Sequence, residues 1–316
     1  MSWYSEFDSI CQTDAPLSRY TWYKLGGPAR WLFEPRDETE LARLVARCRE
    51  AGVSWRVLGH GANLLVRDAG FDGAVIRLEH CGLDEAAIAD CGLRIAEFDR
   101  PDSNKSAIAT DTENHIAINA GADFPKFVRK TIGQGLVGLE VLAGIPGTIG
   151  GIVRMNAGGR YGEVKDFVRA VRIVDAVGGL RWLTCEQVGF RYRHTDLQDC
   201  VIVGAAFELQ EGDPQAALDR FRDIWNEKYD QQPPVSARSA GCIFKNPPGH
   251  SAGRLIDQAG LKGARVGGAE ISEKHANFIV AQNGATAADV LALIETAQRR
   301  VLEQFGVRIE TEVEIW

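Results

Sequence analysis

The sequence predicts a globular protein of two domains that mix helices and strands. Its 316 residues are many for one domain, and 45% of them are hydrophobic against 25% charged, an ordinary balance for a chain with a buried core. Segments with helical periodicity alternate with short apolar runs that suit strands. A polar run at Gln210–Pro214 separates the two parts, so we expect a domain boundary near residue 210.

The predicted elements of the first part follow from caps and apolar spacing. Asp37 with Glu40 three residues later begins a helix with an apolar stripe, and Gly52 ends it. Residues 84–113 are polar and mixed in charge, which favours a surface excursion. The expected elements are a helix over 37–52, strands over 55–58, 64–66 and 116–119, and a short helix over 124–132.

The second half continues the mixture. Pro233 and Pro234 end one helix, and a long helix follows later with its apolar residues on one face. Residues 307–315 alternate between apolar and charged side chains, the pattern of a half-buried strand. The expected elements are strands near 168–176, 180–183, 201–209, 277–281 and 307–315, and helices over 215–229, 251–259 and 287–305.

Charge and hydropathy exclude several classes of protein. Lys and Arg number 36 against 43 Asp and Glu, and the net charge of −7 argues against binding nucleic acid or an anionic membrane nonspecifically. No apolar run approaches the roughly 20 residues of a membrane span. The first residues are acidic where a signal peptide is basic. We therefore expect a cytoplasmic protein without nucleic-acid or membrane partners.

The cysteines indicate reduced thiols. Seven scattered cysteines in a chain of this length do not form a disulfide framework, and no His or Cys cluster has the spacing of a zinc site. We expect no metal. The seven are Cys11, Cys48, Cys81, Cys91, Cys185, Cys200 and Cys242.

Glycine is the over-represented residue, with 34 in the chain. Glycine is required where φ is positive or where backbone approaches a ligand closely. The Gly59–Asn63 loop lies between two strands, which is not the strand-to-helix setting of a Rossmann fingerprint. The run Gly138–Gly151 has too many aliphatic residues for an exposed linker, and we expect a buried, irregular loop. Such turns far apart in sequence suggest a backbone-lined cleft for an extended ligand.

Three local features could carry chemistry, and each has a plainer interpretation. Cys242 follows Gly241 and could be a reactive thiol or a small buried hydrophobic residue. The cluster Phe190–Thr195 could be a site or a charged loop. The acidic face of residues 307–315 could be catalytic or a solvated edge.

In combination these features resemble the UDP-N-acetylenolpyruvoylglucosamine reductase family, flavoenzymes of peptidoglycan precursor synthesis. The resemblance runs from about Pro16 to Val313 and rests on eight runs in the order that the family has them. These runs are Thr21–Ala29, Leu58–Val66, Gly138–Gly151, Met155–Gly158, Tyr192–Thr195, Gly241–Pro247, Ser272–Ile279 and Ile309–Val313. The close spacing after Gly241 is similar to the shorter form of the family.

The resemblance implies an α+β fold. Residues 16–210 look like the two-subdomain FAD-binding domain of vanillyl-alcohol-oxidase-type (PCMH-type) flavoproteins, and residues 211–316 look like a smaller α+β substrate domain. The pyrophosphate of non-covalent FAD would lie against the loop after Leu58, since exposed N–H groups stabilise phosphate oxygens. The implied FAD contacts are Gly59, His60, Gly61, Ala62, Asn63, Leu64, Gly121, Gly144, Ile145, Pro146, Gly147, Thr148, Gly150, Gly151, Asn156, Ala157 and Gly158.

The family's reaction implies three catalytic residues. NADPH reduces FAD, and flavin N5 then delivers hydride to the β-carbon of UDP-N-acetylglucosamine enolpyruvate, giving UDP-N-acetylmuramate. Arg193 would neutralise charge that develops on the substrate carboxylate, and Glu312 would hydrogen-bond to it. Cys242 would protonate the α-carbon, where the commonest family pattern has Ser. An ordinary thiol pKa of roughly 8.5 makes Cys a far stronger acid than a serine hydroxyl. Glu310 is the alternative to Glu312.

We expect a monomer that binds a small nucleotide sugar. One alternative function is that of an oxidase whose FAD is covalently bound to His60. The other is a regulatory protein that binds a nucleotide without catalysis. The implied contacts of the UDP sugar are Lys228, Gln232, Lys245, Asn246, Lys274 and His275, each of which could equally be a surface residue.

Overall fold

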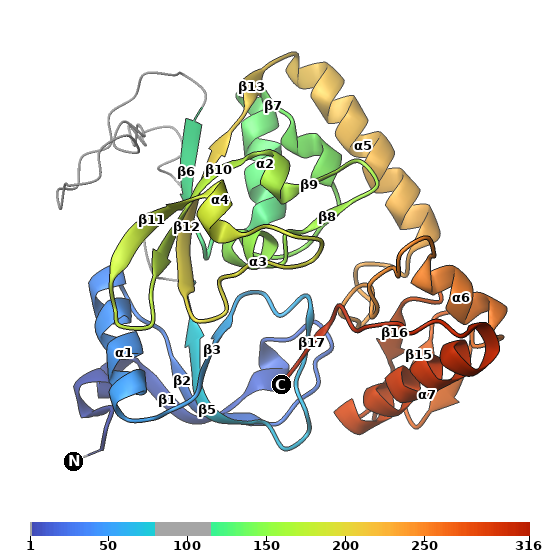
Figure 1. The fold of residues 1–316 in the computed structure, drawn as a ribbon, viewed down its shortest axis with the longest axis horizontal. Coiled ribbons are helices and arrows are strands. Elements are labelled where there is room, and N and C mark those ends of the chain that lie inside the picture. The colour runs from blue at the N-terminus through green and yellow to red at the C-terminus, as the bar shows by residue number, and fades with distance from the viewer. Residues whose placement is uncertain (1, 80–114) are drawn as a thin grey trace. The chain divides into compact units, whose positions relative to one another are not determined.

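The computed structural model describes residues 2–79 and 115–316, so the excursion predicted at 84–113 lies outside the described residues (Figure 1). Contacts group the chain into two compact units. The first contains Met1–Ile10, Glu34–Val53 and Ile76–Trp225, and the second contains Cys11–Phe33, Ser54–Val75 and Asn226–Trp316. The C-terminal segment therefore shares a unit with two N-terminal segments. These units are defined by contacts and do not test the domain boundary near residue 210, which stays a prediction.

A four-stranded antiparallel sheet organises the first unit, with the order β11-β10-β12-β6. The central strand β12 is buried along almost its whole length, which explains its continuous apolar run. Phe207 of β12 packs on Phe127, with ring centroids 5.2 Å apart. The strands are β6 (His115–Asn119), β10 (Val168–Val174), β11 (Leu180–Thr184) and β12 (Val201–Glu208).

Short polar side chains begin the helices around this sheet. The Asp37 carboxylate accepts the N–H of Glu40, which confirms the predicted start of α1 (Glu38–Glu50). Glu38 in this helix forms a 2.7 Å ion pair with Arg172 of β10. Asp123 and Thr148 cap α2 and α3 in the same way. The helices are α1 (Glu38–Glu50), α2 (Phe124–Gly133), α3 (Ile149–Arg154), α4 (Cys185–Val188) and α5 (Pro214–Gln231), the last continuing into the second unit.

The prediction of an irregular loop over Gly138–Gly151 is wrong in part. A 3-10 turn, η4 (Leu139–Leu142), lies inside it, and α3 begins at Ile149. Capping by Thr148 and the apolar Ile149, Ile152 and Val153 compensate for two glycines in this short helix. The other short elements of the unit are η1 (Ser5–Ile10), η5 (Val164–Asp166), β7 (Leu136–Val137), β8 (Gly158–Gly159), β9 (Gly162–Glu163) and β13 (Gln210–Glu211).

The second unit contains a four-stranded sheet of order β1-β2-β5-β3. A separate parallel pair joins β4 to the C-terminal strand β17, with Leu64 opposite Glu314. The Tyr23 hydroxyl, fully buried, donates to the carbonyl of Ile279, 256 residues further along. The elements are β1 (Cys11–Pro16), η2 (Leu17–Arg19), β2 (Pro28–Phe33), β3 (Trp55–Leu58), β4 (Leu64–Leu65), β5 (Phe71–Arg77) and β17 (Glu314–Ile315).

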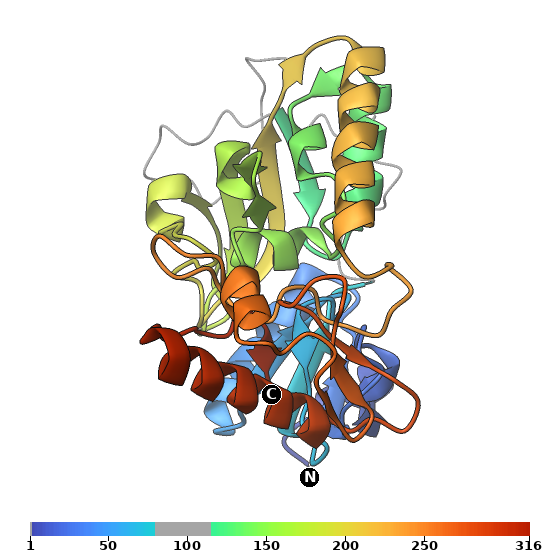
Figure 2. The same cartoon turned by 90° about the vertical axis from the view of Figure 1, so that its right-hand side faces the viewer.

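The C-terminal segment supplies most of a hydrophobic core beneath α7, the long red helix in Figure 2, and Tyr23, Leu25 and Leu65 belong to the same core. The predicted helix over 287–305 is confirmed, with Thr286 as its cap and Gly306 at its end. The carboxylate of Asp68 also accepts the N–H groups of Ala287 and Ala288 at 2.9 and 3.0 Å. The elements are α6 (Ala252–Gln258), β14 (Arg265–Val266), β15 (Ala269–Ile271), β16 (Ile279–Ala281) and α7 (Ala287–Phe305).

The prediction of one strand over 307–315 is wrong in its length. Burial does alternate, since Ile309 and Val313 are buried and Glu310 is exposed. Regular pairing, however, covers only Glu314–Ile315, and Thr311 makes a single bridge to Phe244. The segment binds a loop rather than a neighbouring strand for most of its length. None of the helices within the described ranges is long and apolar enough to cross a membrane.

Candidate functional site

The Gly59–Asn63 loop of the second unit is built for close backbone contact. Gly61 is buried with φ +62°, and a Cβ there would lie 2.3 Å from the carbonyl oxygen of Tyr20. The carbonyl of Gly61 accepts the N–H of Trp22 at 3.1 Å. Across the described residues, no hydrogen bond within the protein uses the N–H of Gly61 or Ala62. Two adjacent donors in a tight loop suit an anionic ligand.

The C-terminal segment is tied to this loop. The side-chain amide of Asn63 donates to the carbonyl of Glu312 at 3.1 Å, and the N–H of Glu314 donates to the carbonyl of Asn63 at 3.0 Å. The N–H of Glu312 in turn donates to the carbonyl of Ile243 at 2.7 Å. The second unit therefore brings together the glycine loop, Glu312 and the residue after Cys242. The Cys242 thiol is half-buried, so it is not the fully buried hydrophobic residue of the plainer interpretation.

The described cysteines are thiols, not disulfides. Burial raises the pKa of Cys48 to about 12, which makes that thiol unreactive at neutral pH. In the ranges 2–79 and 115–316, no three His, Cys, Asp or Glu side chains cluster as metal ligands.

Arg193 of the first unit lies at the tip of a tight turn. Arg191 and His194 exchange backbone hydrogen bonds of 2.9 and 3.1 Å, which leaves Tyr192 and Arg193 as the two turn residues. Arg193 has φ +52°, an uncommon conformation for a residue with a side chain. Its guanidinium donates to the carbonyl of Gly158 at 2.7 Å and lies over the Tyr192 ring.

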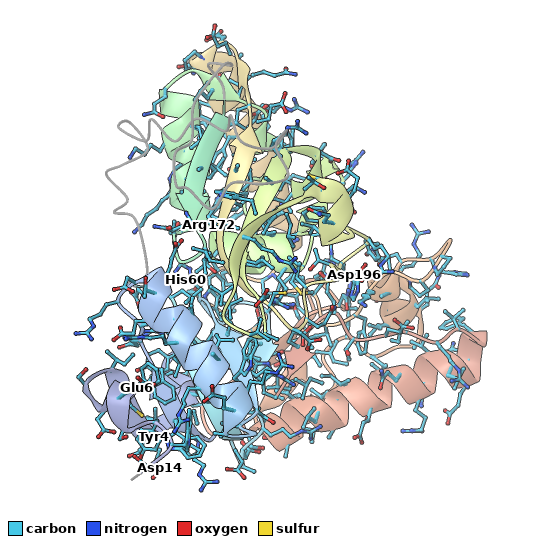
Figure 3. All side chains as sticks on the ribbon, turned by 60° about the vertical axis from the view of Figure 1, so that its left-hand side comes forward. Tyr4, Glu6, Asp14, His60, Arg172 and Asp196 are labelled. Carbon is cyan, nitrogen blue, oxygen red and sulfur yellow. The ribbon has the colours of Figure 1, made fainter. Side chains whose placement is uncertain are left out.

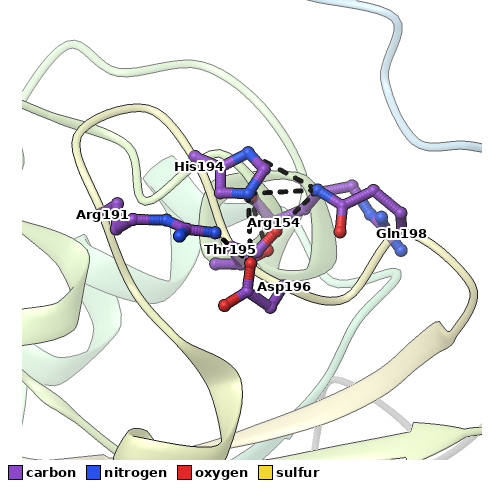
Figure 4. A network of polar contacts seen from close by, with 6 residues as sticks. All are labelled: Arg154, Arg191, His194, Thr195, Asp196 and Gln198. Carbon is purple, nitrogen blue, oxygen red and sulfur yellow. Dashed lines mark hydrogen bonds and ion pairs between the residues drawn. The ribbon is translucent and has the colours of Figure 1, made fainter.

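Polar contacts fix the base of this turn (Figure 4). Asp196 contacts both Arg191 and His194, the latter at 3.3 Å. The buried Thr195 hydroxyl donates to the carbonyl of Arg154 at 2.9 Å, and the Gln198 amide donates to the carbonyl of Thr195 at 2.7 Å. The predicted cluster is thus an ordered turn anchored to α3, with Arg193 at its tip.

The glycines of the 144–151 run differ in role. Gly144 and Gly147 adopt φ values of +76° and +141°. The N–H groups of Ile149 and Gly150 donate to Ala122 and Ala120 at 2.9 and 2.8 Å, so the first turn of α3 is bound to the end of β6. Gly121 fits beside the carbonyl of Leu78, which a Cβ would approach to 2.3 Å. Part of the glycine content therefore serves close packing of backbone on backbone.

Comparisons with known proteins match both parts of the chain. An FAD binding domain model matches residues 29–184, and the model of the UDP-N-acetylenolpyruvoylglucosamine reductase C-terminal domain matches residues 232–316. The enzyme of that name from Heliobacterium modesticaldum is 40% identical over 95% of this chain and 88% of its own length. The Enterococcus faecalis enzyme is 38% identical over 96% and 93%. The chain belongs to the UDP-N-acetylenolpyruvoylglucosamine reductase family.

A solved structure agrees on the fold. The UDP-N-acetylenolpyruvylglucosamine reductase from Thermus caldophilus is similar with a TM-score of 0.74 and 37% identity, covering 97% of this chain and 98% of that one. The predicted α+β FAD-binding domain with a smaller C-terminal domain is confirmed. As a member of this reductase family, the protein is an FAD-dependent oxidoreductase.

The Gly59–Asn63 loop fits the cofactor that the reductase family uses. Its donors at Gly61 and Ala62 suit a pyrophosphate, and Gly61 admits no side chain. His60 is exposed in this loop (Figure 3). The loop belongs to the second unit by its contacts, whereas Gly121, Gly144–Gly151 and Asn156–Gly158 belong to the first.

Several residues expected to contact the reductase's UDP sugar have local partners. Asn246 accepts the N–H of Ala252 at 2.9 Å at the start of α6, and His275 accepts the N–H of Asn277 at 3.2 Å. Lys274 donates to the carbonyl of Tyr229 at 2.6 Å, and Lys245 lies 4.0 Å from Glu310. The N–H of Gln232 donates to the carbonyl of Lys228 at 2.9 Å. Burial and the charge of Lys262 lower the pKa of His275, which favours its neutral form.

Sequence reasoning missed Asn277. This buried side chain donates to the carbonyl of Phe244 at 2.8 Å and accepts its N–H at 2.9 Å, and its own carbonyl accepts the N–H of Ile243 at 2.8 Å. Asn277 thereby pairs with the segment after Cys242 as a strand would. A polar residue inside an apolar run was the available signal, since buried polar groups are almost always hydrogen-bonded.

Proposed function

We propose that the protein reduces UDP-N-acetylglucosamine enolpyruvate to UDP-N-acetylmuramate, with NADPH as the reductant and FAD held non-covalently. Membership of the reductase family over nearly the whole chain is the observation that carries this proposal. Residues 16–210 would form the FAD-binding domain and residues 211–316 the substrate domain. The matched ranges 29–184 and 232–316 fall within these limits.

Bound FAD would supply the chemistry of accepting and donating hydride. The loop Gly59–Asn63 would hold its pyrophosphate through backbone N–H groups. The glycines of the 144–151 run with positive φ would give the first unit a second stretch of bare backbone for the same cofactor.

The substrate's carboxylate gains negative charge as its double bond is reduced. Arg193 would neutralise that charge, because a planar guanidinium matches a carboxylate with two donors. Glu312, in its protonated form, would donate a hydrogen bond to the same carboxylate, and its backbone is held by Asn63 and Ile243. Removal of one such electrostatic contact typically costs ~3 kcal/mol of transition-state stabilisation.

Cys242 would donate the proton that the α-carbon needs. Cys242 is half-buried. The preceding residue, Gly241, has a positive φ of 74°, which turns the backbone sharply before the thiol. The backbone on its other side is fixed, since the N–H of Ile243 donates to Asn277 and its carbonyl accepts from Glu312 and Val313. A fixed proton donor suits general acid catalysis.

The test is NADPH oxidation by the purified protein with and without UDP-N-acetylglucosamine enolpyruvate. Consumption that depends on this compound supports the proposal. A flavoprotein that is reduced slowly but ignores the compound would overturn the assignment of substrate. Flavin that stays with acid-precipitated protein would instead favour covalent attachment through His60.

A further inference from the structure

Asn156 connects three segments of the first unit through one fully buried side chain. Its amide nitrogen donates to a Glu163 carboxylate oxygen at 2.9 Å and to the carbonyl of Arg191 at 3.0 Å. Its amide oxygen accepts the N–H of Lys165 at 3.2 Å. The side chain thus reaches the first residue of the turn that carries Arg193.

The backbone of Asn156 contacts Arg193, at the tip of the same turn. Its carbonyl accepts from the Arg193 guanidinium at 3.4 Å, next to the 2.7 Å bond from the same guanidinium to Gly158. Among the described non-glycine residues, only four have positive φ, and Asn156 at +39° and Arg193 at +52° are two of them. Such conformations persist where the surroundings fix them, and here the two residues bind each other.

Glu163 determines which way the Asn156 amide points. An ionised carboxylate only accepts hydrogen bonds, so the NH₂ end of the amide must face it, and the second hydrogen of that NH₂ is then directed at Arg191. Burial alone raises the pKa of Glu163, but hydrogen bonds from Lys165 and Asn156 and the charges of Lys165 and Arg193 together lower it below the ordinary value. The Lys165 ammonium lies 2.9 Å from the carboxylate.

We propose that Glu163 is a positioning residue for Arg193, acting through the side chain of Asn156. Glu163 orients the Asn156 amide, the amide holds the carbonyl of Arg191, and the turn then presents the Arg193 guanidinium. This inference rests on the proposed function, because it takes Arg193 as the group that meets the substrate carboxylate. It follows that Glu163 affects the reduction of the enolpyruvyl substrate more strongly than the reduction of the protein by NADPH.

The test compares Glu163→Ala, Glu163→Gln and Asp166→Asn in the two half-reactions. Asp166 is the matched control, an exposed carboxylate in the same loop that accepts the N–H of Glu163 at 2.8 Å. We expect Glu163→Ala to slow reoxidation of the reduced enzyme by substrate about ten- to a hundred-fold, since small misplacements of a reacting group have effects of this size. Glu163→Gln keeps an acceptor and should lie between wild type and Glu163→Ala.

The outcomes separate the two proposals. Unchanged reduction by NADPH, an unchanged melting temperature for Glu163→Gln and a near wild-type Asp166→Asn would support the positioning role. Equal loss in both half-reactions, or equal loss in Asp166→Asn, would overturn it. If Glu163→Ala does not fold, the Gln variant decides, and wild-type rates for it would overturn the role. A wild-type protein that ignores the substrate contradicts the proposed function instead.

Discussion

The side-chain amide of Asn63 and the backbone carbonyl of Glu312 are joined by a 3.1 Å hydrogen bond across 249 residues of sequence. Asn63 closes the glycine loop, and its own carbonyl accepts the N–H of Glu314. Asn63 therefore connects the loop proposed to bind pyrophosphate with the backbone of the residue whose carboxyl group is proposed to bind substrate.

Asn63→Ala should lower both the stability of the protein and its retention of FAD. The carbonyl of Glu312 loses its donor, so we expect a loss of about 1 to 2 kcal/mol in the free energy of unfolding and weaker retention of FAD. Urea denaturation and flavin released on gel filtration measure the two effects. Asn283→Ala, which removes an exposed amide, is the control. Equal behaviour of both variants would contradict the proposed link.

Gly61→Ala should destabilise far more than Gly52→Ala. Both glycines have similar positive φ values, +62° and +65°, so both variants bear the cost of about 1 kcal/mol for a left-handed alanine. Only at Gly61 would the new Cβ meet backbone, 2.3 Å from the carbonyl oxygen of Tyr20, whereas nothing lies within 4 Å at Gly52. Thermal denaturation of the two variants isolates the steric effect, and equal melting temperatures would refute it.

Asn277→Ala should be strongly destabilising. The variant leaves the N–H and carbonyl of Phe244 without their partners in a buried place, and we expect a loss of about 3 kcal/mol in unfolding free energy. Chemical denaturation checks this, with Asn283→Ala again as the exposed comparison. A loss below about 1 kcal/mol would mean that water or a neighbour replaces the amide.

Cys242→Ala should abolish turnover of the enolpyruvyl substrate while reduction of the flavoprotein by NADPH continues. The proposed proton donor is gone, but NADPH oxidation needs no carbon acid. Cys242→Ser should retain part of the activity, because a serine hydroxyl can still donate a proton from this position. Alkylation should inactivate the wild-type enzyme, while Cys48, with its pKa raised to about 12, stays unmodified in the folded protein. Full turnover by Cys242→Ala would remove this thiol from the mechanism.

The pKa of His275 predicts a loss of stability in acid. Burial and Lys262 lower the pKa in the folded protein below the ordinary 6.5. Between the two pKa values the unfolded chain binds a proton that the folded protein does not, so stability is complete above about pH 6.5 and falls as the pH drops toward the folded value. Urea unfolding should show a shallower acid loss for His275→Gln than for wild type. His250→Gln, at an exposed histidine, should follow wild type.

Local sequence signals predicted the longer helices but missed the short α3 and α4. The candidate site residues came only from the family resemblance. The cap at Thr286 and the end at Gly306 define α7 within the sequence itself. In contrast, the strand predicted over 307–315 depends on a partner, and the partner is the loop at Ile243–Lys245. The alternation of apolar and charged residues predicted which side chains of this segment are buried. It could not show that no strand among the described residues pairs with most of the segment.

Asn277 and Glu163 escaped prediction for the same reason. Asn277 acts on Phe244, 33 residues earlier, and Glu163 acts through Asn156 on a turn near residue 191. Neither contact has a periodic signature. Polar residues that bind distant backbone are identified only when the fold places both partners.

The Tyr23–Ile279 hydrogen bond has a consequence for how the protein is made. Translation at about 5 to 20 residues per second separates synthesis of these two residues by roughly ten to fifty seconds. The first strands of the second unit thus leave the ribosome long before the segment that covers Tyr23. Through that interval Tyr23 lacks the segment that buries it in the folded protein, so apolar surface of the nascent chain is exposed to aggregation.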